Sequence, residues 1–372
     1  MENNLLKSPK QEIKEHQLYI TNLFVWIKLL VQNGIVLKHF SKYLKITFFT
    51  VLSTPFQLIQ YIYLSPKRLT KKELPHDPIF IIGHWRSGTT HLHYLMNLDD
   101  QFICLENFQA FFFRIAFVSR RILRPVLQQF MPDKRPQDNI TINAFSPCEE
   151  EHPLTNLTAL SGMQSFFFGK NLKYFNKGNL HQGLTKRESI KWINTYHNML
   201  LQIQWFNKSN KQLLLKNPHN TARVKLLLEK YPKAKFIYLH RNPLEVYSSM
   251  HHLYKKTIST QHLQEINNSD VKQNIIYFYQ STIEGYLKNR SLIPPNQLIE
   301  ISYKELDEAP VNTINKIYKS LKINGFKRVE TKLTSYCNSL KDYKKNNFPA
   351  LSIEDELSVR KKWKIGFEAW KY

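Results

Sequence analysis

The sequence predicts an α/β fold of three layers, in which a central parallel sheet is flanked by helices, over residues 76–372. Three short apolar runs carry this prediction, because strands buried on both faces read as continuous apolar stretches. They are residues 80–82, 213–215 and 236–239. Each run ends at a turn that holds a polar or cationic residue, and a helical pattern follows. This order of strand, loop and helix is typical of α/β domains.

A helical extension over residues 1–75 is expected before this unit. Two apolar and aromatic runs, 18–31 and 43–52, are interrupted by single lysines. Neither run has the roughly 20 uninterrupted apolar residues of a spanning helix, and we expect Pro55 to break the second. Basic residues among large apolar ones suit helices at a membrane interface. Residues 18–66 are therefore expected either to contact a membrane peripherally or to form a helical cap on the α/β domain.

Charge and cysteine content limit the classes of partner. Lysine and arginine outnumber aspartate and glutamate by 53 to 29, a formal net charge of +24. The excess indicates nucleic acid, anionic lipid or a polyanionic cofactor, although a generally lysine-rich composition contributes too. The sequence has no RNP-like, helix-turn-helix or zinc-finger pattern, so no nucleic-acid partner is expected. Cys104, Cys148 and Cys337 form no Cys-x-x-Cys pair, and residues 1–17 are polar and charged, which favours a cytoplasmic protein without a cleavable signal.

The turn after the first apolar run has the spacing of a phosphate-binding loop. Four residues separate Gly83 from Gly88, which Thr89 and Thr90 follow. A helix that starts there points its unpaired amides at the turn, which makes an anion site. The P-loop lysine is replaced by Thr89, which argues against ordinary phosphoryl transfer, and Arg86 supplies a cation instead.

A second apolar run closes on a comparable pattern. Arg241 follows residues 236–239, Pro243 suits the first turn of a helix, and Ser249 lies eight residues after the arginine. An arginine fork and a serine hydroxyl together suit a phosphate group. The two motifs lie about 155 residues apart. Two phosphate-binding patterns in this order are not expected to occur together by chance.

The residues 86–90 resemble the 5′-phosphosulfate loop of sulfotransferases, which use 3′-phosphoadenosine 5′-phosphosulfate (PAPS), and the pattern from Arg241 to Ser249 resembles their 3′-phosphate site. The resemblance covers residues 78 to about 370 and implies the P-loop-like fold of that family. The family's Arg-Lys-Gly segment at the 3′-phosphate is not found. By resemblance, the cofactor-binding residues are Arg86, Ser87, Gly88, Thr89, Thr90, Arg241, Ser249 and, at the adenine, Tyr303.

Sulfuryl transfer needs a base for the proton of the acceptor hydroxyl. The segment 146–153, with a serine cap and a proline, predicts a helix start, and its Glu149 and Glu151 match an acidic motif of bacterial sulfotransferases. Glu106 occupies the place of the catalytic glutamate of the more distant tyrosylprotein sulfotransferases. His84, inside the loop, is a third candidate.

Lys216 ends another apolar strand and matches a family lysine that stabilises the sulfuryl oxygens; Asn217 follows where the family has serine. Arg86 and Lys216 are thus expected to act in catalysis together with Glu149, Glu151 or Glu106. No metal is expected. The apolar stretch 108–118 is expected to be helical, and it is either core or the wall of an acceptor pocket.

These observations predict a PAPS-dependent sulfotransferase that acts on a hydroxyl or amine. A lipid or other hydrophobic alcohol is the leading acceptor, a glycan the second, and the oligomeric state stays open. The alternatives are a P-loop kinase, which would need a lysine at 89 and a magnesium-binding aspartate after a strand, and a non-catalytic protein that binds anionic ligands or nucleic acid.

The remaining elements follow from periodicity. Helices are expected over 188–206, 270–289, 310–323 and 326–340, and a strand starts at residue 298.

Overall fold

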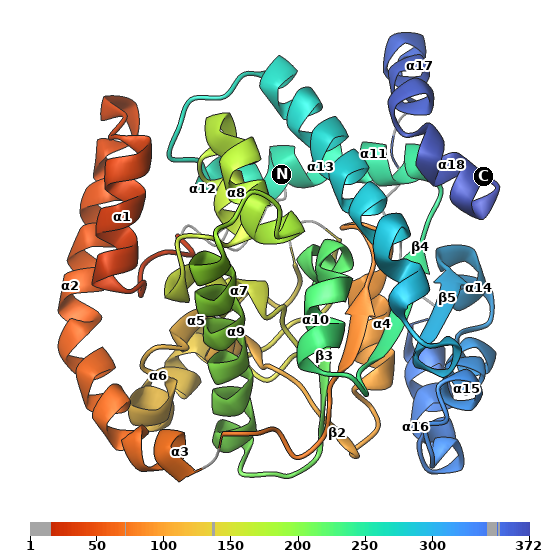
Figure 1. Cartoon of the computed structure of the whole chain (residues 1–372), viewed down its shortest axis with the longest axis horizontal. Helices are drawn as coiled ribbons and strands as arrows, with labels where there is room; N and C mark the ends of the chain where they lie inside the picture. The colour runs from red at the N-terminus through yellow and green to blue at the C-terminus, as the bar shows by residue number, and fades with distance from the viewer. Residues whose placement is uncertain (1–15, 71, 136–137, 341–347, 349) are drawn as a thin grey trace, which may run out of the picture.

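Five parallel strands form the centre of the molecule (Figure 1). The computed structural model describes residues 16–70, 72–135, 138–340, 348 and 350–372. Strand order in the sheet is β2-β3-β1-β4-β5, and each neighbouring pair is parallel. The strands are β1 (Ile79–Ile82), β2 (Phe102–Ile103), β3 (Gln212–Lys216), β4 (Lys235–His240) and β5 (Leu298–Ser302). The predicted α/β class with a central parallel sheet is confirmed.

Alternate side chains of the strands enter two separate cores, because successive residues of a strand point to opposite faces. Ile79, Ile81 and Leu239 pack on one face with four helices. These helices are α4 (Thr89–Met96), α14 (Tyr303–Glu308), α15 (Pro310–Ser320) and α16 (Phe326–Ser339). Phe80 and Ile82 pack on the other face, in a larger core. Helices therefore cover both faces, and the layers are three.

The larger core holds helices from the middle and the end of the chain. They are α8 (Leu172–Leu180), α9 (Lys186–Asn207), α10 (Val224–Lys230), α11 (Pro243–Leu253), α13 (Asn268–Asn289) and α17 (Ile353–Lys362). The helices α5 (Asn107–Phe112), α7 (Glu151–Leu157) and α18 (Lys364–Trp370) also contact this core. Helix α6 (Ala116–Phe130) packs with Phe108 and Phe206 in a smaller core, and α12 (Ser259–Gln261) is a single short turn. The helices expected from periodicity over 188–206, 270–289, 310–323 and 326–340 are confirmed as α9, α13, α15 and α16.

The N-terminal extension forms α1 (Leu23–Asn33), α2 (Phe40–Tyr63) and α3 (Ser65–Thr70), and α1 and α2 lie along the left edge of Figure 1. Trp26, Leu29 and Ile46 join the larger core, so the extension packs on the α/β unit. The expectation that Pro55 breaks the second apolar run is wrong. Pro55 lies inside α2, on its exposed side. The division of the chain at residue 76 stays a prediction.

Two other expectations about local structure are wrong. The stretch 108–118 is not one helix, because Ile115 leaves the helical conformation (φ −131°, ψ 4°) and separates α5 from α6. The segment 146–153 starts its helix at Glu151 rather than at Pro147, because Pro147 forms an antiparallel bridge with Glu106.

Among the described residues, no helix has the length and apolar character needed to cross a membrane.

Candidate functional site

The loop between β1 and α4 is shaped by two glycines. Gly83 and Gly88 have positive φ values of 139° and 95°, a conformation that side chains disfavour. A Cβ atom on Gly88 would lie 2.4 Å from Cδ2 of Tyr303, and one on Gly83 would lie 2.3 Å from the Leu239 carbonyl oxygen. The loop therefore approaches both the backbone of β4 and the ring of Tyr303. Helix α4 begins directly after it, at Thr89, with its first amides turned toward the loop.

The two motifs predicted to hold phosphates meet in space. Arg86 donates from Nε to Ser249 Oγ at 2.8 Å, and Arg241 donates to the Arg86 carbonyl at 3.2 Å. The Arg241 guanidinium lies over the Tyr303 ring, 4.3 Å from its centroid. Arg241 also pairs with Glu245 at 2.6 Å. The structure thus brings together the arginines, the serine and the tyrosine singled out in the sequence, at the carboxyl ends of β1, β4 and β5.

Asp138 completes this cluster, and the sequence analysis did not predict it as a site residue. Its carboxylate accepts from Arg86 at 3.0 Å and from Arg135 Nε at 2.8 Å. Burial raises the pKa of Asp138, but Arg135 and Arg86 outweigh burial and hold it below its usual value. A single aspartate in a polar loop carries no motif, so its contact with Arg86, 52 positions earlier, was not visible.

Lys216 and Glu149 form an ion pair beside the loop. Lys216 is 2% exposed, ends β3 and also donates to Thr90 Oγ1, in the first turn of α4, at 3.2 Å. Burial raises the pKa of Glu149, whereas Lys216 and then His152 lower it, so that the net pKa lies below its usual value of 4.5. A carboxylate that is ionised at neutral pH thus lies next to the cation that binds the loop helix.

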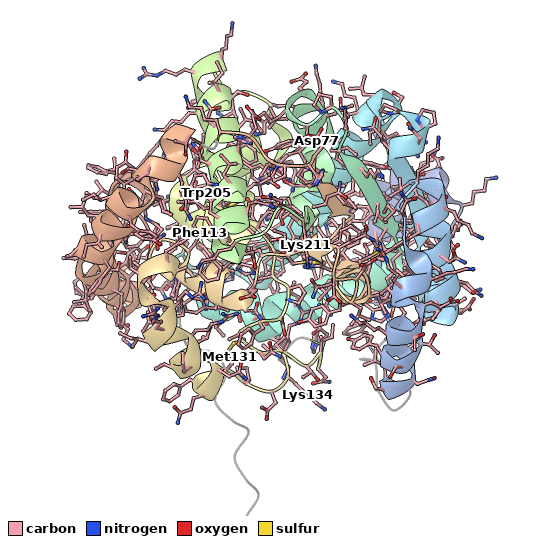
Figure 2. The ribbon with its side chains drawn as sticks, turned by 90° about the horizontal axis from the view of Figure 1, so that it is seen from below. Asp77, Phe113, Met131, Lys134, Trp205 and Lys211 are labelled. Atoms are coloured by element: carbon pink, nitrogen blue, oxygen red, sulfur yellow. The ribbon has the colours of Figure 1, made fainter. Side chains whose placement is uncertain are left out.

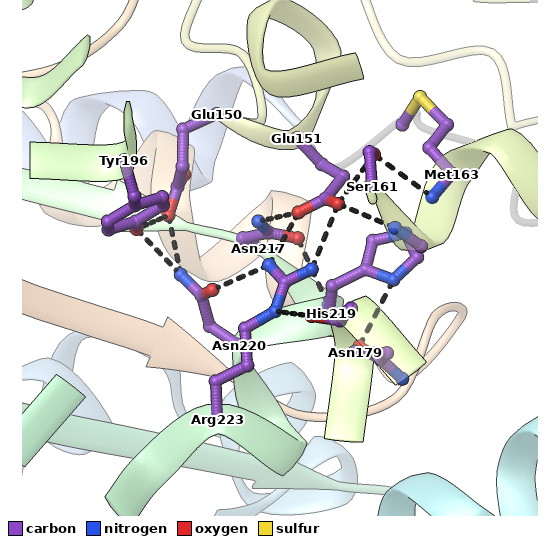
Figure 3. A network of polar contacts seen from close by, with 12 residues as sticks. Glu150, Glu151, Ser161, Met163, Asn179, Tyr196, Asn217, His219, Asn220 and Arg223 are labelled. Carbon is purple, nitrogen blue, oxygen red and sulfur yellow. Dashed lines mark hydrogen bonds and ion pairs between the residues drawn. The ribbon is translucent and has the colours of Figure 1, made fainter. Parts of the chain in front are cut away.

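Glu151, two residues later, lies in a fully buried network (Figure 3). Its two oxygens accept from Arg223 at 2.6 and 3.0 Å, and from Asn217, Ser161 and the Gly162 amide. Burial raises the pKa of Glu151, but Arg223 dominates and lowers it strongly. Every oxygen of Glu151 is engaged by the protein, which is the environment of a structural carboxylate.

The other two predicted bases lie in different surroundings. Glu106 caps α5 and pairs with Arg124 at 2.6 Å. His84 is buried, contacts the Trp85 carbonyl oxygen through Nδ1 at 2.9 Å and lies 4.9 Å from the Tyr279 ring; burial lowers its pKa to about 3. Of the residues predicted as bases, Glu149 lines the cavity described next, and Glu151, Glu106 and His84 do not.

A cavity of about 280 Å³ opens beside the loop. At one end it is polar and is lined by Arg86, Thr89, Thr90, Glu149, His152 and Lys216. The remaining wall is mostly apolar and includes Phe111, Met131, Ile142, Phe166, Leu253 and Ile258. Of the stretch 108–118, Phe111 reaches this wall, whereas Phe108 is core. A molecule in the cavity would place a polar end at Glu149 and an apolar body along the wall. In the described part of the chain, no group of three or more His, Cys, Asp and Glu residues is placed to hold a metal.

Comparisons with known proteins show which family the chain belongs to. A profile of the sulfotransferase family matches residues 78–327. The omega-hydroxy-beta-dihydromenaquinone-9 sulfotransferases Stf3 of Mycobacterium tuberculosis and Mycobacterium bovis are each 27% identical to this chain over 352 residues, 92% of this chain and 87% of theirs. The structure of sulfotransferase STF1 from Mycobacterium tuberculosis H37Rv has a TM-score of 0.67 at 18% identity, covering 91% of this chain and 90% of that one. Sulfotransferase STF9 from Mycobacterium avium has a TM-score of 0.62 at 14% identity, with coverage of 94% and 97%. Since the family profile spans more than half of the chain, the chain belongs to the sulfotransferase family.

Proposed function

We propose that this sulfotransferase moves the sulfuryl group of PAPS to a hydroxyl of a hydrophobic acceptor, a lipid alcohol in the first place. The observation that carries the proposal is the position of the Lys216–Glu149 pair. Lys216 contacts the first turn of α4, and Glu149 lines the polar end of a largely apolar cavity. A base and an oxyanion-binding cation thus stand between a phosphate-binding loop and a place for an apolar molecule.

The residues around the loop fit the proposed donor. Three groups suited to phosphate oxygens converge there: the amides at the start of α4, the Arg86 and Arg241 guanidinium groups, and the Ser249 hydroxyl. The ring of Tyr303 lies against Gly88 and Arg241, where it can stack on an adenine. When bound, PAPS would supply the sulfuryl group and its leaving phosphate.

The residues of the chain would divide the work of transfer by position. Arg86 and Lys216 would hold the oxygens on which negative charge develops. Glu149 would accept the proton of the acceptor hydroxyl, which requires the ionised form that its lowered pKa favours. The buried network of Glu151 and Arg223 fixes Asn217, the residue after Lys216, through the Glu151–Asn217 hydrogen bond of 2.8 Å. Glu151 is thereby assigned to positioning rather than to proton transfer.

Two observations favour a hydrophobic alcohol over a glycan or an amine. The wall of the cavity beyond Glu149 is apolar and aromatic, which suits a hydrocarbon body. The curated relatives are named for an omega-hydroxy menaquinone, a hydrophobic alcohol, as their acceptor. Polar side chains such as Gln17, Asn107 and Lys256 also line the cavity, but most of the lining surface is apolar, so a sugar would place part of its hydroxyl groups against apolar side chains, which is unfavourable.

A transfer assay with a panel of acceptors tests this proposal. We expect sulfate from labelled PAPS to appear on long-chain or polyprenyl alcohols, with the rate rising with hydrocarbon length until the wall is filled, because apolar contact stabilises the bound acceptor. A matched amine and a soluble oligosaccharide serve as controls. Preferential labelling of the oligosaccharide would contradict the assignment of the acceptor, and labelling of no member of the panel would contradict the assignment as a whole.

A further inference from the structure

Helix α2 has its polar and apolar sides reversed relative to a helix that faces water. The side turned to the protein buries Thr50, Ser53, Gln57 and Gln60 together with Tyr43 and Ile46. The opposite side exposes Phe48, Leu52 and Ile59 among others, and Phe48 is 61% exposed. Figure 2 shows side chains of this outer edge projecting away from the body of the protein. Buried polar and exposed apolar side chains on one helix are the informative exception to ordinary burial.

The buried amides show that the orientation of α2 is specified rather than accidental. Gln60 donates to the Phe113 carbonyl at 2.8 Å and accepts from the Phe117 amide at 2.8 Å. Gln57 donates to the Thr21 carbonyl at 3.1 Å. A rotation of α2 that hid its apolar side would take these amides away from the Thr21 and Phe113 carbonyls and the Phe117 amide, at a cost comparable to a lost hydrogen bond for each backbone group left buried. The apolar side therefore stays outward in the folded chain.

Helix α1 extends the apolar area beside α2. It buries Trp26 and Leu29 and exposes Phe24 and Val31, at 80% and 81%. We call the exposed apolar side chains of α1 and α2 the outer face, represented by Phe24, Val31, Phe48, Leu52, Phe56 and Ile59. Many exposed apolar side chains gathered on two neighbouring helices indicate an interaction site.

The charge around the outer face identifies the partner. From residue 16 to residue 72 the sequence contains lysine, arginine and histidine but no aspartate or glutamate. Lys28 and Lys45 are exposed on α1 and α2 themselves. Glu265 of another segment pairs with Lys38 at 3.1 Å, but α1 and α2 themselves contribute cations and no acids. Apolar side chains with cations beside them are complementary to a surface that is apolar inside and negative at its rim. Tyr61 and Tyr63, exposed at the end of α2, are of the type enriched at the level of lipid headgroups.

We propose that the outer face docks the protein on an anionic lipid bilayer, with α1 and α2 lying in the interface. The inner side of α2 is held by the protein, so only the outer side enters the lipid. The docking surface stands on its own observations, whereas its use in delivering a lipid acceptor rests on the proposed function.

The inner side of α2 connects docking with the cavity. Lys42 donates to the carbonyls of Thr260 and His262 at 2.8 and 2.9 Å, and Thr260 lines the cavity. Gln60 holds the Phe113 carbonyl, two residues after Phe111 of the cavity wall. A protein docked through α2 would therefore bring this cavity close to the lipid from which a hydrophobic alcohol is drawn.

Co-sedimentation of the full chain with vesicles tests the proposal. We expect binding to vesicles of phosphatidylcholine and phosphatidylglycerol in equal parts, weaker binding to phosphatidylcholine alone, and a decrease with added salt. A variant with Phe48→Ser, Leu52→Ser and Ile59→Ser should lose at least about tenfold in vesicle affinity, because each side chain contributes apolar burial. A matched variant with Leu292→Ser, Ile353→Ser and Leu357→Ser, three exposed apolar residues elsewhere, should bind like the parent.

The proposal would be overturned if the parent protein stayed in the supernatant with both vesicle types, or if the Phe48, Leu52 and Ile59 variant bound vesicles as tightly as the parent. It would also be overturned if the parent bound no vesicles but formed a concentration-dependent dimer, and the variant did not. The last outcome would assign the outer face to a second copy of the chain. Thermal stabilisation by adenosine 3′,5′-bisphosphate, measured on the same variant, reports the donor site separately. Loss of docking with stabilisation retained would therefore leave the proposed donor intact.

Discussion

The Lys216→Met substitution is expected to lower kcat by about 10²- to 10³-fold, the effect of removing one preorganised donor to a developing negative charge. Lys216 is positioned for this role because it is buried, ends β3 and contacts both Thr90 and Glu149. Methionine is unbranched, keeps most of the length of the side chain and removes the charge. The loss is expected in kcat rather than in binding of adenosine 3′,5′-bisphosphate, which lacks the sulfuryl oxygens.

Lys235→Met is the matched control for this variant. Lys235 begins β4, which is separated from β3 by β1, at the opposite end of the strands from Lys216, and it donates to the Lys322 carbonyl at 3.3 Å near solvent. The same chemical change there should leave the rate unaltered. Equal rates for the parent and Lys216→Met would contradict the role assigned to Lys216.

The Glu149→Gln substitution is expected to lower kcat by at least about 10²-fold, as for loss of a general base. Glutamine fits the same space and cannot accept the proton. Because the pKa of Glu149 is held below 4.5, the base is ionised at neutral pH in the parent protein. The rate of the parent should therefore fall only as the pH drops through this lowered pKa, and a pH–rate profile of kcat/KM reports it.

Glu151→Gln should act on stability instead. Removing one partner of a buried pair leaves Arg223 uncompensated, which costs about 3 kcal/mol or more in the free energy of unfolding. The pKa of Glu151 is lowered in the folded state, so the pair contributes its full stabilisation at pH values above 4.5, the usual pKa of a glutamate. This contribution is lost as the pH falls toward the lowered pKa of the folded state. If Glu151→Gln were fully stable but inactive, and Glu149→Gln were active, the roles of the two glutamates would have to be exchanged.

Much of the fold followed from local signals. Buried parallel strands are continuous apolar runs, and β1, β3 and β4 were found by that feature alone. The loop was found from the spacing of Gly83 and Gly88, and both glycines have the positive φ values for which glycine is suited. The family resemblance gave Arg86 and Ser249 to two separate phosphate sites of one cofactor, and the hydrogen bond of 2.8 Å between Arg86 Nε and Ser249 Oγ was not foreseen.

The rest depended on contacts between distant segments. Glu149 and Glu151 are two residues apart and equally acidic, so the sequence left both as bases; only their neighbours, Lys216 and Arg223, separate them. The start of α7 was misplaced because Pro147 is held by a bridge to Glu106 across the fold. Pro55 was misjudged because contacts of α2 with the rest of the fold, such as the hydrogen bonds of Gln57 and Gln60, offset the cost of a proline inside the helix.

The most direct test of the proposed donor is the thermal stability of the purified protein with adenosine 3′,5′-bisphosphate, compared with ATP and magnesium. At one hundred times its dissociation constant, the bisphosphate should add about 2.7 kcal/mol to the free energy of unfolding. Arg241→Ala should remove this gain, because Arg241 lies at the proposed 3′-phosphate site against Tyr303. Stabilisation by ATP with magnesium instead, or by neither ligand, would contradict the assignment of PAPS as donor.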